Sequence, residues 1–156
     1  MPFEYLPIMA QNSAPKPPRV LASPSSPGGC PVTKPVNEMR VALLSSAALR
    51  LTDQEPFISR EDLSYRRVPS DPSSGAIIID HQSGIGTVPK QDPEIVFPRT
   101  ALAALAENRT IGALAPFHYS FMGGVRRHED IESALAPALA QELAQARVDL
   151  ALLVPY

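Results

Sequence analysis

The chain is poor in several features that would assign a function class directly. It has one cysteine, Cys30, in 156 residues, and no apolar run approaches the length of about 20 residues that a membrane-spanning helix needs. One cysteine excludes an internal disulfide framework and suits a reducing compartment. No basic segment followed by an apolar stretch opens the chain, so we expect no secretory signal and a cytoplasmic location.

Strong charge and familiar motifs are also missing. The formal net charge is -2 and the pI is about 5.9, which gives no electrostatic reason to expect nucleic acid or an anionic membrane as a partner. No Walker or GxGxxG sequence is present, and Gly84-Ile85-Gly86 alone does not make one. The 3 histidines and Cys30 lack metal-ligand spacing, so we predict no metal site.

Proline, by contrast, is abundant and unevenly placed. Many of the 18 prolines fall between Pro15 and Pro35, together with serine and glycine. Proline fixes φ and removes a donor, so residues 1–38 are predicted to be an arm that is poorly ordered or wraps a surface. An arm that crosses a partner subunit is the alternative. Cys30 lies in this arm without a His or a helix start to activate it, so we interpret it as incidental.

Residues 39–156 are predicted to form a single domain in which strands and helices alternate. Short apolar runs predict strands, and apolar residues spaced for one helix face predict helices. The predicted strands are 40–46, 76–80, 111–115 and 148–154, and the predicted helices are 99–108 and 129–147, the second kinked by Pro137. This order is typical of an α/β fold with a parallel-type sheet and flanking helices, Rossmann-like or flavodoxin-like.

The last predicted strand ends with the chain. Val148 to Val154 reads as a buried interior strand covered on both faces, and Pro155 and Tyr156 follow it. In open α/β sheets the chemistry lies just beyond the carboxyl ends of the strands. We therefore expect the fold to be incomplete at its C-terminus.

Polar side chains follow the other predicted strands. They are Ser45 and Ser46 after the first, His81 after the second, and His118, Tyr119 and Ser120 after the third. If the strands are parallel, these groups face one crevice together with the C-terminus. Alternatively, one strand is antiparallel.

Each candidate has a functional and an ordinary interpretation. Ser45 and Ser46 suit donation to an oxyanion or phosphate, although no glycine-rich cradle surrounds them. Arg66 suits a carboxylate clamp, or is a solvated surface arginine. His118 is either a proton donor or a half-buried histidine beside two aromatic residues, and His81 is either a site residue or part of an ordinary turn.

Several segments carry a resemblance to a known family. The segments, in order, are 34–47, 63–69, His81, 92–98, 111–123 and 148–155. Over about Lys34–Tyr156 the chain resembles the selenoprotein B family of glycine, sarcosine, betaine and D-proline reductases. The family pattern differs at Glu94, where it has Asn, at Thr100-Ala101, where it has Asp-Arg, and at or beside Ala48, where it has Gly.

The resemblance implies a reductase site whose reactive residue is absent from this chain. In the family a selenocysteine, or in some relatives a cysteine, follows the strand that matches 148–154. Its selenolate attacks the α-carbon of an amino acid and cleaves the C–N bond, and a pyruvoyl group on a partner subunit activates the substrate. No catalytic residue is then expected within the chain. The resemblance implies a substrate-binding rim of Ser45, Arg66, His81, His118 and Ser120.

Three hypotheses follow. The first is a reading frame truncated at a UGA codon after Tyr156, inactive alone, whose partners are reductase subunits or further copies and whose substrate is small and amino-acid-like. The second is an accessory subunit that holds a small carboxylate without chemistry. The third is an interaction protein that docks through its proline arm and an open sheet edge.

Overall fold

A computed structural model describes residues 31–81, 87–125 and 127–156. Residues 34–156 form one compact unit. Cys30, the Gly84–Gly86 turn and most of the predicted arm lie outside the described residues. The division of the chain into an arm, residues 1–38, and a domain, residues 39–156, stays a prediction.

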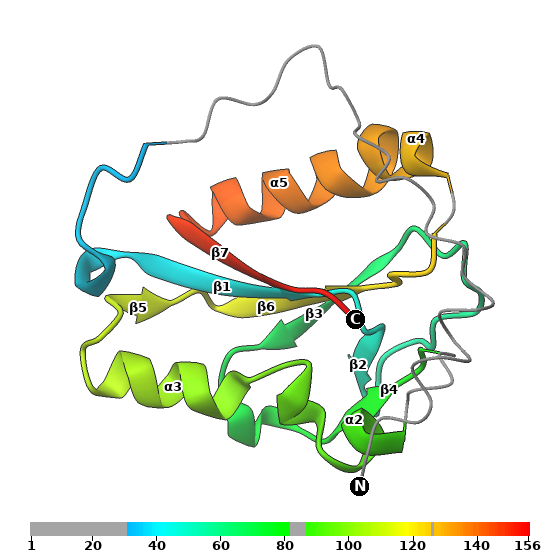
Figure 1. Ribbon diagram of the computed structural model, residues 1–156, viewed down its shortest axis with the longest axis horizontal. Coiled ribbons are helices and arrows are strands. Elements are labelled where there is room, and N and C mark those ends of the chain that lie inside the picture. The colour runs from blue at the N-terminus through cyan, green and yellow to red at the C-terminus, as the bar shows by residue number, and fades with distance from the viewer. Residues whose placement is uncertain (1–30, 82–86, 126) are drawn as a thin grey trace, which may run out of the picture. The chain divides into compact units, whose positions relative to one another are not determined.

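Four strands come first along the unit, and helices and strands alternate from residue 87 onward (Figure 1). The strands are β1 (Arg40–Ser45), β2 (Leu49–Leu51), β3 (Tyr65–Pro69), β4 (Ile77–Ile79), β5 (Ala113–Leu114), β6 (Phe117–Phe121) and β7 (Leu150–Val154). The helices are α2 (Thr87–Gln91), α3 (Arg99–Glu107), α4 (His128–Asp130) and α5 (Ala136–Gln145). Short 3-10 turns cover Val36–Glu38, Pro72–Ser74 and Pro93–Ile95, and a π turn covers Ile131–Leu135.

The main sheet is built around β1. It pairs in parallel with β7 along one edge and with β5 and then β6 along the other, while β3 pairs antiparallel with β6. β2 and β4 form a separate antiparallel pair. The predicted α/β fold with a mostly parallel sheet and flanking helices is therefore confirmed, and it is consistent with a Rossmann-like or flavodoxin-like arrangement.

Helices cover the two faces of this sheet, α3 on one and α5 on the other (Figure 1). Successive strand residues point to opposite faces. Val41 and Leu43 of β1 pack in one core cluster with Leu102 of α3. Leu44 packs on the other side, in a cluster that includes Leu139 of α5. β1 is thus buried by neighbours on both edges and both faces.

The third predicted strand is interrupted and then continues. β5 ends at Leu114, and β6 resumes at Phe117 beyond Pro116, which has no N–H to give to a ladder. His118, Tyr119 and Ser120 therefore lie inside a strand, and the prediction that they follow one is wrong.

The polar region between residues 51 and 74 contains a strand that the sequence did not indicate. Tyr65–Pro69 forms β3, at the edge of the main sheet. The predicted strand 76–80 exists as β4, but its partner is β2. His81 therefore does not follow a strand of the main sheet, because it follows β4, which pairs with β2 in the small second sheet.

The last strand forms as predicted, but it is less buried than predicted. β7 pairs with β1 alone, and Leu150, Leu152 and Leu153 are 40%, 41% and 59% exposed. The prediction of a strand buried on both faces is wrong, because successive residues such as Leu152 and Leu153 point to opposite faces and both are partly exposed.

The last predicted helix forms without a break, but its helical geometry changes along its length. Helical residues run from His128 to Gln145, and the π turn at Ile131–Leu135 comes just before Pro137. Proline has no N–H to donate to the preceding turn, so a wider turn is a suitable way to enter it. No helix in the described ranges is long and apolar enough to cross a membrane.

Candidate functional site

The carboxyl end of β1 turns sharply and is pinned by β6. The Ala48 N–H donates to the Phe121 carbonyl at 3.0 Å, and the Gly123 N–H donates to the Ser46 carbonyl at 2.9 Å. The Ser45 hydroxyl accepts from the Ala47 N–H at 3.3 Å. Ala48 takes a left-handed φ of 51°. This is a tight, locally strained turn at the predicted site.

Two side chains of β6 bond to backbone instead of facing a crevice. The Leu49 N–H donates to the Ser120 hydroxyl at 2.7 Å, and the Leu43 N–H donates to Nδ1 of His118 at 3.2 Å. Both side chains are fully buried. The His118 bond replaces a ladder bond where β6 leaves the regular register with β1, and the Ser120 bond ties β6 to β2.

The register itself explains the role of His118. Val41 pairs with Leu114 and Leu44 with Tyr119, so three steps along β1 match five steps along β5 and β6. The Leu43 N–H falls in this bulge, where the imidazole accepts it. A buried N–H without a partner is costly, so the histidine stabilises the bulge.

The electrostatics keep His118 neutral. Burial, with the positive charge of Arg99 as a second cause, lowers the pKa of His118 from 6.5 to about 4. Nδ1 is the acceptor, so the proton of the neutral ring is on Nε2, which is buried and has no hydrogen-bond partner among the described residues. The Phe97 ring packs edge-on against the imidazole, with 5.9 Å between the ring centroids.

Arg99 is the nearby buried cation. It is 5% exposed at the start of α3, and its guanidinium donates to carbonyls of the 69–75 segment, the shortest bond being 3.2 Å to Gly75. The other acceptors are the Pro69, Asp71 and Pro72 carbonyls and the Ser74 hydroxyl. Arg99 therefore ties α3 to the loop after β3, and sequence reasoning missed it because a single Arg at a helix start carries no distinctive pattern.

The carboxyl end of β7 meets Ser46 and His81. The Tyr156 N–H donates to the Ser46 hydroxyl at 2.8 Å, and that hydroxyl lies 3.4 Å from the Tyr156 carbonyl oxygen. The His81 and Tyr156 rings meet edge-on at 5.1 Å. Two of the predicted site residues are thus brought together, although they come from different sheets.

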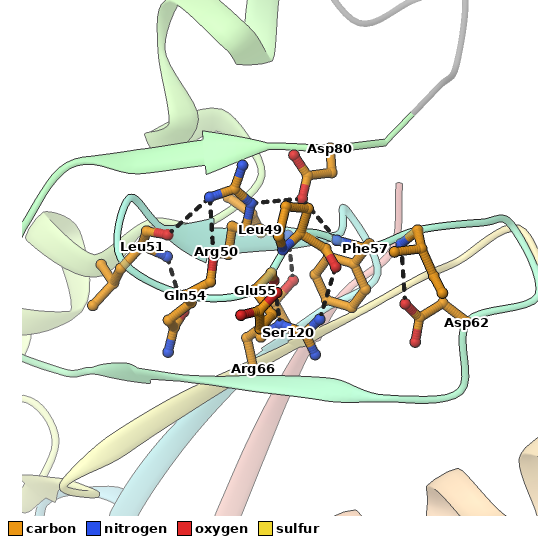
Figure 2. Close-up of polar contacts among 12 residues, drawn as sticks. Leu49, Arg50, Leu51, Gln54, Glu55, Phe57, Asp62, Arg66, Asp80 and Ser120 are labelled. Carbon is orange, nitrogen blue, oxygen red and sulfur yellow. Dashed lines mark hydrogen bonds and ion pairs between the residues drawn. The ribbon is translucent and has the colours of Figure 1, made fainter.

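Arg66 lies on β3, beside the small second sheet (Figure 2). Its guanidinium stacks on the Phe57 ring at 4.3 Å and donates to the Glu55 and Pro56 carbonyls at 2.8 and 3.1 Å. Arg50 and Asp80 form an ion pair at 2.7 Å, and Asp80 also accepts from the Phe57 N–H at 3.0 Å. Donors of Arg66 are engaged by backbone, and Asp80 is a structural residue that the sequence did not single out.

Tyr119 lies on the opposite face of β6 from His118 and Ser120. Its hydroxyl donates to Glu142 of α5 at 3.4 Å, and the Tyr65 hydroxyl donates to the same carboxylate at 2.9 Å. Arg67 also pairs with Glu142 and is the first cause of the lowered pKa of that carboxyl. The network fastens α5 to the sheet, and Tyr119 is not brought to the carboxyl end of β7.

The structure thus brings some of the predicted site residues together and separates others. Ser46 and His81 both contact Tyr156 at the end of β7, with Ser45 of β1 and Ser120 of β6 buried behind them. His118 lies deeper, and Arg66 and Tyr119 serve other contacts. The described residues contain no group of three or more His, Cys, Asp or Glu side chains that could hold a metal. An open pocket of about 600 Å³ lies at the other end of β1, lined by residues that include Lys34, Arg40 and Arg147.

Comparison with known proteins identifies a relative of this chain. The chain is 31% identical over 123 residues to the D-proline reductase subunit gamma of Acetoanaerobium sticklandii, an alignment that covers 79% of this chain and 51% of that protein. The chain thus spans about half the length of the curated relative it matches. No family model matches, and neither does any solved structure. The resemblance to the selenoprotein B reductases is confirmed.

Proposed function

We propose that this chain is part of a subunit of a D-proline-reductase-like enzyme that cleaves a C–N bond of a small amino-acid or betaine-type substrate. The observation that carries the proposal is the position of the carboxyl end of β7 beside Ser46 and His81. This is the end of the sheet where α/β enzymes place their chemistry. The 31% identity to a reductase subunit supports the same reading.

The reaction needs a nucleophile at that point. A selenol or thiol supplies it by attacking the α-carbon, and reduction then adds two electrons and two protons, so that a C–H and an N–H bond replace the C–N bond. The residues of this chain supply the surroundings: Ser46 and His81 border the position, while Ser45, His118 and Ser120 hold the backbone behind it. The pyruvoyl group implied by the family is assigned to a partner subunit, so no residue here is proposed to hold it.

The first test is the nucleotide sequence. We expect the Tyr156 codon to be followed by UGA and further coding sequence, which would place the nucleophile directly after β7. A UAA or UAG codon without a downstream frame would contradict this part of the proposal.

The second test is activity. The complete subunit, purified with its partners and given a dithiol reductant, is expected to convert D-proline, glycine, sarcosine or betaine to the C–N-cleaved product, while the 156-residue chain alone is expected to be inactive. Mass spectrometry of the products distinguishes the four substrates. Absence of cleavage of all four by the complete complex would overturn the assignment.

A second candidate function, an interaction module, is favoured by the exposed β7 edge. The strand has no charge, so two copies related by a twofold axis can pair antiparallel without opposing like charges. Leu150, Leu152 and Leu153 are the side chains that a second copy would cover.

Light scattering over a concentration series tests this candidate. We expect a dimer that Leu152→Lys converts to a monomer. Ile58→Lys is the control, since Ile58 is also apolar and 87% exposed but belongs to the loop between β2 and β3. A wild-type chain that stays monomeric at high concentration would rule out pairing between copies.

A further inference from the structure

Ser46 holds the segment that leaves β7 through three hydrogen bonds. Regular pairing of β1 with β7 ends at Ser45 opposite Val154. Beyond it the Ser46 N–H donates to the Val154 carbonyl at 3.3 Å, and the Ser46 hydroxyl accepts from the Tyr156 N–H at 2.8 Å. The same hydroxyl donates to the Tyr156 carbonyl oxygen at 3.4 Å. The side chain therefore extends the ladder past the end of the strand.

The position of Ser46 is fixed from the side of β6. The Gly123 N–H donates to the Ser46 carbonyl, and a Cβ at Gly123 would come within 2.8 Å of that oxygen and 2.9 Å of the Ser46 Cβ. Only glycine allows this close approach. Ser46 is thus held between β6 and β7, and its hydroxyl direction is set by both.

His81 meets the same segment from the other sheet. Its ring lies edge-on to the Tyr156 ring at 5.1 Å, with 74° between the planes. Tyr156 also packs against the core cluster on the α3 face. Ser46 fixes the backbone of Tyr156 and His81 restrains its ring.

We infer that Ser46 and His81 are positioning residues, which fix the path of the backbone at the carboxyl end of β7 and do not themselves bind substrate. The importance of this role rests on the proposed function, in which the reactive group sits at that end. A nucleophile must be held in a productive geometry, and a small displacement costs much of the rate. Gly123, Ser46 and His81 together provide such a hold from three separate segments.

Nuclear magnetic resonance of the full 156-residue chain tests the inference without substrate. We expect Ser46→Ala to raise the exchange rate of the Tyr156 amide roughly tenfold, the effect of losing one hydrogen bond of ordinary net strength. Ser45→Ala is the matched control: the neighbouring hydroxyl bonds only the Ala47 N–H among the described residues, so the Tyr156 amide should be unaffected. Unchanged exchange in Ser46→Ala would overturn the role of Ser46.

Titration of the histidine signals tests the second contact and does not depend on Ser46 variants folding. Burial, aided by the positive charge of Arg60, lowers the pKa of His81 below 6.5. Tyr156→Ala should expose the His81 ring to water and raise the pKa of His81. Tyr156→Phe keeps the contact between the two rings and should leave the pKa of His81 unchanged. No difference between the two variants would overturn the role of His81. Neither measurement uses substrate. A negative result in either one therefore would not contradict the proposed reductase function, and an inactive complete complex would not contradict the positioning roles of Ser46 and His81.

Discussion

β1 and β7 are hydrogen-bonded neighbours with similar apolar sequences, RVALLS and LALLV, yet they have opposite environments. Leu43 pairs with Leu152 in register, and Leu43 is 0% exposed whereas Leu152 is 41% exposed. The difference is positional. β1 has strands along both edges and helices over both faces, while β7 has one neighbouring strand among the described residues. An apolar run therefore predicts a strand, but its burial depends on what lies beside it.

The largest expected effect on stability comes from truncating Leu43, and truncating its in-register partner Leu152 is the comparison. Leu43→Ala should lower the free energy of unfolding by about 3–4 kcal/mol, because it opens a cavity in a closed core. Leu152→Ala should cost less than about 1 kcal/mol, because much of the removed surface is already in water. Urea denaturation of dilute protein measures both. Equal losses would mean that β7 is as buried as β1 in solution.

The next effect concerns the bulge beside β1, where His118 is neutral. The unfolded pKa is near 6.5 and the folded pKa is about 4, so the unfolded state takes up the proton more readily. The contribution of His118 is fully present above pH 6.5 and is lost as the pH falls toward 4, with a total on the order of 3 kcal/mol.

Chemical denaturation between pH 7 and 4 measures this loss. His118→Gln, which keeps an acceptor for the Leu43 N–H but does not titrate, should flatten the profile. His128→Gln removes an exposed histidine and should leave the profile steep. A wild-type profile that is already flat would show that the imidazole is not held neutral.

Smaller effects are expected at the left-handed residues beside each strand. Ala48, with φ 51°, follows β1, and Arg147, with φ 52°, precedes β7. Arg147→Gly should stabilise the protein by about 1 kcal/mol, because Gly adopts this conformation without a Cβ clash. Ala48→Gly should gain less, because it also removes a fully buried methyl group. Thermal denaturation ranks the two, and a destabilised Arg147→Gly would contradict the prediction.

The smallest effect is expected at the most exposed residue of β7. Leu153 is 59% exposed, so Leu153→Lys should change the unfolding free energy of dilute protein by less than about 0.5 kcal/mol. A loss above about 2 kcal/mol would mean that this side chain is covered in solution, and the contrast with β1 would disappear. Calorimetry at low concentration makes the measurement.

Much of the fold was predictable from local pattern. The apolar runs at β1 and β7 and the helix-spaced leucines of α5 formed as predicted, because each pattern reflects the face that an element must bury. β3 was missed because Tyr65, Arg66 and Arg67 look like a solvated loop. They form a strand because Tyr65 and Arg67 reach Glu142, 77 and 75 positions away in the sequence.

The sequence by itself determined four of the strands, the two long helical segments, the α/β class and the resemblance to the reductases, because these depend on residue type and spacing. It also supplied Ser46 and His81 as candidates. Only the tertiary structure decided that His118 and Ser120 hold backbone, that Ser46 and His81 meet at Tyr156, and that β7 is open to solvent. Each of these depends on which distant segments become neighbours, and pairing register and burial are set by that arrangement and not by local composition.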